Sequence, residues 1–209
     1  MCGIVGQINL DGGPVSSAVL KRMTDSIIHR GPDGEGQWVE GSIGFGHRRL
    51  AIIDTSSAGK QPMISADHRF VLTYNGEVYN FRELRTELEA KGYQFNSQTD
   101  SEVVLSALAE WGEGAFMKFN GMFAFALYDN FKKKFYLCRD RYGIKPLYYW
   151  LSSEKTLVFG SEVKSILKYR DYQSEVDKEV LLEYFTFQNI FTNKTLYKNI
   201  NILESGHYF

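Results

Sequence analysis

Two neighbouring stretches decide the fold class: residues 122–129 read MFAFALYD, and residues 134–139 read KFYLCR. Both are rich in aromatic and aliphatic side chains, and a short polar turn containing Asn130 separates them. This pattern predicts two antiparallel strands joined in a hairpin. A second pair, residues 146–152 and 156–160, is joined at Ser152-Ser153-Glu154 and predicts another hairpin.

Outward from these hairpins, strands are predicted over residues 3–9, 43–53 and 69–75. Helices are predicted over 16–28, 81–91, 101–111 and 162–169. The first helix would place its apolar side chains on one face: Val19, Leu20, Met23, Ile27 and Ile28. Asn80 with Glu83, and Thr99 with Glu102, resemble capping boxes at the starts of the next two helices. Helices and hairpins in separate blocks indicate an α+β fold with largely antiparallel sheets.

Composition excludes several classes of function. The 209 residues favour one large domain over two small ones. With 24 basic and 25 acidic residues the formal net charge is −1, so no basic surface for nucleic acid is expected. The start of the chain is unlike a signal peptide, and the longest apolar stretch, near 122–128, is too short to cross a bilayer. We therefore expect a cytoplasmic protein with neither a membrane nor a nucleic-acid partner.

The two cysteines, Cys2 and Cys138, lie far apart in sequence, and a reducing compartment disfavours a disulfide between them. The four histidines lack the spacing of metal ligands, so no metal site is expected. Cys138 stands in an apolar strand and is interpreted as a packing residue.

Cys2 follows the initiator Met1, and its small side chain permits removal of that methionine. Removal would leave a thiol and an α-amine on one residue, which together form a nucleophile with its own base. An α-amine with a pKa of about 7.7–8.0 is partly unprotonated near neutral pH. The plain alternative is an unremarkable residue at a frayed chain end.

Further motifs favour the nucleophile. Cys2-Gly3-Ile4-Val5-Gly6 resembles the opening of the class II glutamine amidotransferases, which are N-terminal-nucleophile (Ntn) hydrolases. The phrases that follow, in this order, are similar to the glutaminase domain of the asparagine synthetases: His29-Arg30-Gly31-Pro32-Asp33, residues 46–54 (GHRRLAIID), Gln61-Pro62-Met63, residues 74–80 (YNGEVYN), residues 99–102 (TDSE), residues 121–129 and residues 140–149 (DRYGIKPLYY). The resemblance spans residues 1–209 and implies a four-layer αββα sandwich.

The resemblance also implies a reaction. Cys2 would attack the side-chain amide of L-glutamine, release ammonia and form a thioester that water hydrolyses to L-glutamate. Asn75 through its side chain and Gly76 through its backbone N–H would stabilise the oxyanion. Taken alone, Asn75-Gly76 is also the favoured dipeptide of a tight hairpin turn.

Other residues would bind the substrate. Arg49 would bind the α-carboxylate, and Arg48, on the opposite face of the strand, could not also reach the site. Asp100, assisted by Glu77, would hold the α-ammonium, and the backbone of Ile52 and Ile53 would line the pocket. The alternatives are a surface arginine for Arg49 and a helix-dipole carboxylate for Asp100.

The glycine-rich segment 30–36 is interpreted as a mobile lid over glutamine, with a passive surface loop as the alternative. Residues from about 171 to 209 look less regular and are interpreted as a closing segment or linker. The ending His207-Tyr208-Phe209 lacks a polar terminus, as if a further domain should follow.

In the family, that domain is a synthetase that activates aspartate with ATP and Mg, and its Ser-Gly-Gly-x-Asp-Ser loop is absent here. No cofactor is expected in residues 1–209. The expected partners are L-glutamine and a C-terminal synthetase domain, and a homodimer is possible. Two alternatives stay open: a glutaminase whose ammonia goes to another acceptor, such as a sugar carboxylate, or a non-catalytic module of the same fold.

Overall fold

The computed structural model describes residues 1–209, which form two antiparallel sheets. The six-stranded sheet has the order β10-β8-β9-β1-β3-β2, with β1 Gly3–Asn9, β2 Gly34–Glu40, β3 Ile43–Arg49, β8 Tyr148–Leu151, β9 Thr156–Gly160 and β10 Ile200–Ile202. The four-stranded sheet has the order β4-β5-β6-β7, with β4 Met63–Ile64, β5 Phe70–Val78, β6 Gly121–Asp129 and β7 Lys134–Arg139. Both predicted hairpins, β6–β7 and β8–β9, are confirmed.

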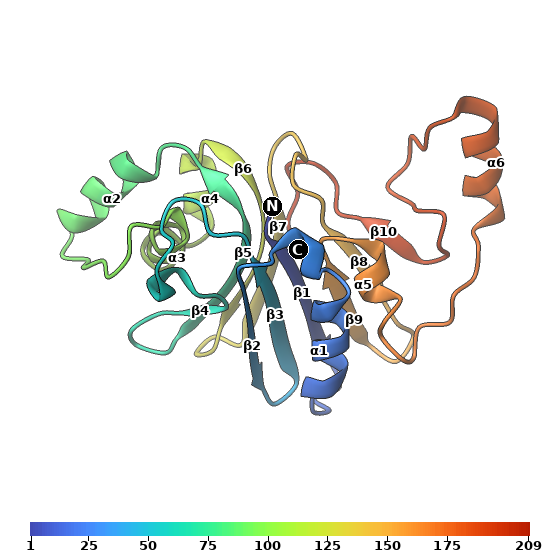
Figure 1. Cartoon of the computed structure of the whole chain (residues 1–209), viewed down its shortest axis with the longest axis horizontal. Helices are drawn as coiled ribbons and strands as arrows, with labels where there is room; N and C mark the ends of the chain where they lie inside the picture. Colours follow the sequence, from blue (N-terminus) through green and yellow to red (C-terminus); the bar gives the residue numbers. More distant parts are fainter.

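Helices cover the outer faces of the two sheets (Figure 1). The covering helices are α1 Ser17–Asp25, α2 Phe81–Glu89, α3 Asp100–Trp111, α4 Ala115–Lys118 and α5 Val163–Ile166, and a further helix, α6 Lys178–Phe187, lies apart from the sheets. In Figure 1, α1 and α5 lie over the six-stranded sheet, whereas α2, α3 and α4 lie over the four-stranded sheet. None of these helices is long and apolar enough to cross a membrane.

Three buried clusters match the three interfaces between these layers. One joins α1 and α5 to the six-stranded sheet, the second lies between the sheets, and the third joins the four-stranded sheet to α2 and α3. Successive residues of a strand point to opposite faces, so Val5 of β1 enters the first cluster and Ile4 the second. The predicted α+β sandwich with layers αββα is therefore confirmed.

Helix boundaries depart from the predictions where polar side chains find other partners. The hydroxyl of Thr99 caps α3 by accepting from the Glu102 backbone N–H, which confirms one half of the predicted capping box. The other half is absent, because the Glu102 carboxylate accepts from the N–H groups of Asn96 and Ser97 and not from that of Thr99. The Asn80 side chain does not cap α2, so that prediction is wrong. It accepts from the Asn120 N–H and donates to the Lys118 carbonyl, which ties the start of α2 to the segment before β6.

The helix predicted over residues 16–28 ends at Asp25, and a short 3-10 helix follows at Ile28–Arg30. This change of helix type turns Ile28 out to solvent, although Ile27 stays fully buried. The strand predicted over 43–53 ends at Arg49, and the residues after it form an irregular loop.

The segment predicted as a lid, residues 30–36, is not all loop, and its mobility stays a prediction. Residues 34–36 begin β2 and pair with β3, and the Asp33 N–H donates to the Arg49 carbonyl at 3.0 Å. A Cβ at Gly31 would lie 2.3 Å from the Arg48 carbonyl carbon, and one at Gly36 would lie 1.9 Å from the Gln61 carbonyl oxygen. These glycines permit close packing of the segment against the backbone of its neighbours.

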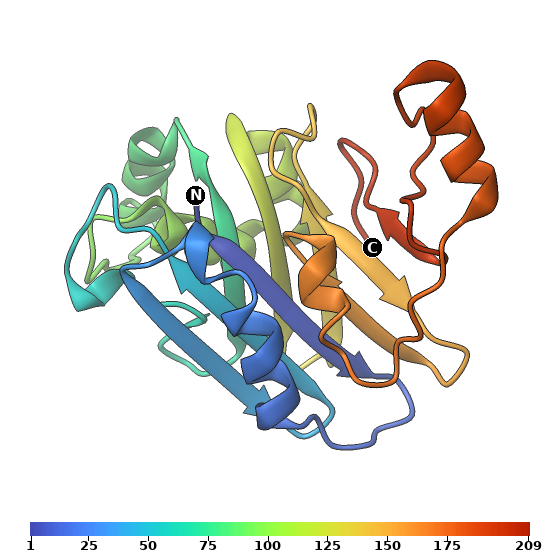
Figure 2. The same ribbon diagram turned by 45° about the vertical axis from the view of Figure 1, so that its right-hand side comes forward.

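Residues 171–209 contain more regular structure than predicted. The helix α6 stands off from the sandwich, and the chain then returns through β10 to the edge of the six-stranded sheet (Figure 2). The last residues run beside β7, where Leu137 and Phe209 exchange backbone hydrogen bonds of 2.9 and 3.2 Å and the Arg139 N–H donates to the His207 carbonyl.

Candidate active site

One cavity of about 190 Å³ brings together all the predicted site residues. It is lined by Cys2, Arg49, Ile52, Ile53, Asn75, Gly76, Glu77 and Asp100, together with neighbours described below. They come from both sheets, from the loop after β3 and from the start of α3. Pockets for drug-sized ligands measure roughly 300–1,000 Å³, so this cavity suits a molecule as small as a free amino acid.

Cys2 immediately precedes β1, a central strand of the six-stranded sheet. Its Sγ lies 3.4 Å from the Leu50 backbone nitrogen, which donates to it, and 3.6 Å from the Leu50 carbonyl oxygen. Burial raises the pKa of the Cys2 thiol, partly offset by the Leu50 contact. The thiol is therefore protonated at neutral pH, and it needs a base before it can act as a nucleophile.

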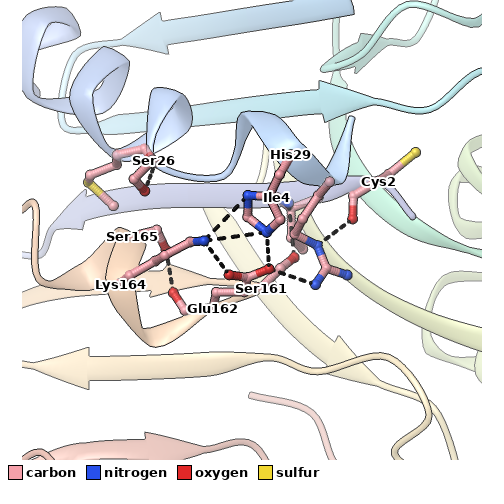
Figure 3. A network of polar contacts seen from close by, with 10 residues as sticks. Cys2, Ile4, Ser26, His29, Ser161, Glu162, Lys164 and Ser165 are labelled. Carbon is pink, nitrogen blue, oxygen red and sulfur yellow. Dashed lines mark hydrogen bonds and ion pairs between the residues drawn. The ribbon is translucent and has the colours of Figure 1, made fainter. Parts of the chain in front are cut away.

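The backbone of Cys2 is held from the other side by Arg30. The Arg30 Nε donates to the Cys2 carbonyl oxygen at 2.9 Å, and its Nη1 donates to Glu162 at 3.0 Å (Figure 3). The Arg30 side chain is buried in this position. The first residues of the chain are thus fixed by a side chain from the turn after α1.

Asn75 and Gly76 lie inside β5, which continues to Val78, so the hairpin-turn alternative is wrong. Asn75 is 1% exposed, and its side-chain Nδ2 has no hydrogen-bond partner. Buried amide donors are nearly always paired, so this N–H is available to a ligand in the cavity. A Cβ on Gly76 would lie 2.5 Å from the Met122 carbonyl oxygen, which excludes any larger residue.

The guanidinium of Arg49 is held by the loop that follows β3. It donates to the carbonyl oxygens of Ser56, at 2.6 Å, and Asp54. A Cβ on Gly59 would lie 2.1 Å from Arg49 Nη2, so a glycine makes room for the guanidinium. Arg48 points the other way, to Asp25 and Glu35, as strand alternation predicts.

Asp100 is the first residue of α3 and is buried. Its Oδ2 accepts from the Tyr74 hydroxyl at 2.7 Å and from the Val78 N–H at 3.0 Å. Burial raises the pKa of Asp100, and these hydrogen bonds lower it in part. Both partners are on Oδ2, which leaves Oδ1 for a cationic group in the cavity. The carboxylate also lies at the N-terminus of α3, so the alternative interpretation, a carboxylate favoured by the helix dipole, holds as well.

Residues 1–209 match the family model described as the glutamine amidotransferase domain. The chain belongs to this family.

Curated relatives that match the whole chain are longer proteins. Asparagine synthetase [glutamine-hydrolyzing] 1 of Bacillus subtilis (strain 168) is 41% identical over 212 residues, which cover 100% of this chain and 33% of the relative. Asparagine synthetase [glutamine-hydrolyzing] 3 of the same organism is 38% identical over 99% of this chain and 34% of its own length. The amidotransferase domain is thus homologous to the glutaminase part of asparagine synthetases, and the chain spans about a third of their length.

Solved structures agree on the fold. A glutamine phosphoribosylpyrophosphate amidotransferase from B. subtilis, complexed with ADP and GMP, has a TM-score of 0.69 at 21% identity, over 84% of this chain and 45% of that one. The allosteric regulatory enzyme of purine biosynthesis has a TM-score of 0.67 at 20% identity, over 80% of this chain and 43% of that one. The amidotransferase domain therefore has the Ntn-hydrolase fold.

Three residues of the candidate site have no role in the prediction from sequence. Tyr74 holds Asp100, and Gln61 accepts from the Tyr74 N–H at 2.7 Å, so it fixes the strand beneath the cavity. Lys145 is buried in the cavity wall, with its Nζ 3.3 Å from the Met1 sulfur. All three stand in motifs that identify the family, but only the fold shows that these motifs meet at Cys2.

Proposed function

We propose that this chain hydrolyses L-glutamine to L-glutamate and ammonia, with Cys2 as the nucleophile after loss of Met1. The Cys2 sulfur attacks the side-chain amide carbon, and the thiol proton passes through the α-amine to the departing nitrogen. Ammonia leaves and a thioester remains. Water then attacks the thioester, giving glutamate and restoring the thiol. The observation that carries this proposal is the convergence of Cys2, Asn75, Arg49 and Asp100 on one cavity.

Removal of Met1 serves the reaction in two ways. It frees the α-amine of Cys2, the base that a thiol with a raised pKa requires. It also clears space, because Met1 lines the same cavity and its sulfur contacts Lys145. Without Met1 the cavity would admit a substrate directly beside the sulfur.

The remaining groups bind and orient glutamine. The unpaired Asn75 Nδ2 donates to the oxyanion, and the Gly76 N–H is the second donor. Arg49 pairs with the α-carboxylate, and Asp100, with Glu77, pairs with the α-ammonium. Ile52 and Ile53 form the rim of the cavity. Loss of one oxyanion donor typically costs about 2.7–4 kcal/mol of transition-state stabilisation, so Asn75 matters more to kcat than to substrate binding.

We further propose that the ammonia passes to a synthetase part of the kind carried by the longer relatives, where it converts aspartate to asparagine. ATP and Mg would act there and not in residues 1–209. The names of the relatives favour aspartate over another acceptor, such as a sugar carboxylate. The complete set of site residues argues against a non-catalytic module.

The exposed apolar surface of α6 favours a contact with a further part of the protein. Around α6 and the turn after it, large apolar side chains are exposed: Leu182, Tyr184, Phe185, Phe187 and Phe191. Val180 is the buried residue of this helix. Since a helix that is apolar on several faces is normally covered by protein, we propose that the synthetase part covers α6.

A test of the nucleophile combines mass and activity. Intact mass should show the loss of Met1, and Cys2→Ala should abolish glutamate release from glutamine. Cys138→Ser is the matched control, because Cys138 is buried away from the cavity, and it should keep activity. Glutamate release that persists in Cys2→Ala would refute the proposal.

A further inference from the structure

The side chain of Glu162 is the hub of a polar network that ends at the nucleophile (Figure 3). Its Oε1 accepts from Arg30 Nη1 at 3.0 Å and contacts His29 Nε2 at 2.8 Å, and its Oε2 pairs with Lys164 at 3.0 Å. Partial burial raises the pKa of Glu162, but the hydrogen bonds from these three groups outweigh burial and lower the pKa to about 2. Glu162 is therefore a carboxylate throughout the working pH range.

The backbone of Glu162 is fixed beside β1. The neighbouring Ser161 exchanges two contacts with Ile4: the Ile4 N–H donates to the Ser161 hydroxyl at 3.0 Å, and the Ser161 N–H donates to the Ile4 carbonyl at 2.9 Å. The Ser165 hydroxyl donates to the Glu162 carbonyl at 2.7 Å. The segment that carries Glu162 is thus hydrogen-bonded to Ile4, which lies two residues after Cys2 in the chain.

Glu162 is the carboxylate that pairs with Arg30. The Arg30 side chain is 8% exposed, and its Nη2 has no partner. Removing the partner of a buried charge is strongly unfavourable, so without Glu162 the guanidinium would shift towards water. Its Nε would then leave the Cys2 carbonyl, which it holds at 2.9 Å.

We infer that Glu162 is a positioning residue for the nucleophile: it locks Arg30, and Arg30 holds the carbonyl of Cys2 so that sulfur and amine face the substrate. This inference rests on the proposed function. Glu162 does not line the cavity, so its loss should affect the reacting atoms and not the binding of glutamine. A displacement of about 1 Å at a reacting group can cost on the order of 100-fold in rate.

The main test is Glu162→Gln, which keeps the size of the side chain and removes its charge. We expect kcat for glutamate release to fall roughly 10- to 100-fold while KM stays within about two-fold. Glu87→Gln is the matched control, since Glu87 pairs with Lys118 at 2.8 Å on the surface, and it should behave as wild type. Glu162→Asp keeps the charge at a shorter reach and should give an intermediate kcat.

A double-mutant cycle tests whether Glu162 acts through Arg30. In an Arg30→Met background, Glu162→Gln should lower kcat by less than about two-fold, because the two residues form one unit. Equal losses of kcat in both backgrounds would contradict the inference.

A readout independent of activity is available because the chain has two cysteines. Carbonyl ¹³C labelling of cysteine gives two NMR resonances, which Cys138→Ser assigns. Glu162→Gln should shift the Cys2 resonance and leave that of Cys138 in place. An unmoved Cys2 resonance together with wild-type kcat would overturn the inference. A wild-type chain without Cys2-dependent glutaminase would instead refute the proposed function, whatever the NMR result.

Discussion

The hydroxyl of Tyr74 donates a 2.7 Å hydrogen bond to Oδ2 of Asp100. The Tyr74 ring packs between the four-stranded sheet and α3, and Asp100 lies in the wall of the cavity. Tyr74 and Asn75 are neighbours on β5 and point to opposite faces of the sheet. One strand therefore supplies the proposed oxyanion donor on one face and, on the other, a support for the carboxylate that we propose binds the ammonium group.

Tyr74→Phe removes this hydrogen bond and leaves the ring in the core. Hydrogen bonds to charged groups contribute about 1.5–3 kcal/mol, so KM for glutamine should rise roughly ten-fold or more. We expect kcat to change little, because in the proposed function Asp100 pairs with the α-ammonium group, away from the reacting amide. Steady-state kinetics distinguish the two parameters, and a fall in kcat at constant KM would contradict this assignment.

The raised pKa of Asp100 predicts a pH dependence of substrate binding. Burial favours the neutral carboxyl, which cannot pair with an ammonium group. KM for glutamine should therefore rise as pH falls through the pKa of Asp100. Because this pKa is raised, the rise should begin at a higher pH than it would for an ordinary aspartate, whose pKa is about 3.9. Asp100→Asn should show a high KM without this dependence. Because the Tyr74 hydrogen bond lowers that pKa, Tyr74→Phe should move the rise in KM to higher pH.

His47 predicts a loss of stability in mild acid. It is fully buried between the sheets, burial lowers its pKa to about 4, and its Nε2 contacts the Tyr74 carbonyl at 3.1 Å. In the unfolded chain its pKa is about 6.5. The contribution of the neutral ring to the free energy of unfolding is thus complete above about pH 6.5. It falls by on the order of 3 kcal/mol as the pH drops towards 4.

The measurement for His47 is urea unfolding between pH 7 and pH 4. His47→Gln keeps a polar side chain but does not titrate, so its free energy of unfolding should change less over this range than that of the wild type. Equal slopes for the two proteins would show that the pKa of His47 is not depressed in the folded state.

The exposed surface of α6 predicts a separation of two activities. Replacing Leu182, Phe185 and Phe191 together by Gln should leave glutamate release by residues 1–209 unchanged, because none of these residues lines the cavity. In a polypeptide that joins this chain to a synthetase part, the asparagine formed per glutamate should fall several-fold. The control is Phe131→Gln, since Phe131 is similarly exposed on the β6–β7 turn. Unchanged coupling in the triple variant would refute the proposed contact.

Local patterns sufficed for the hairpins and the central strands because apolar runs and polar turns act over a few residues. β2 escaped prediction because its start, Gly34-Glu35-Gly36, has the composition of a loop and becomes a strand only by pairing with β3. α6 escaped because its apolar residues do not fall on one buried face.

The site residues were named from motifs, and the fold places all of them around one cavity. The supports behind them were not predictable in this way. Glu162 lies 132 positions from Arg30, and Tyr74 lies 26 positions from Asp100. Such pairs depend on the packing of distant elements, which spacing along the chain does not encode.

The pairing of residues 207–209 with β7 has a consequence for handling the protein. β7 is the last strand of its sheet, and a bare strand edge invites other chains to add to it. A version shortened to residue 205 would uncover the backbone of Leu137 and Arg139, and we expect it to aggregate on concentration even though every residue of the cavity would still be present.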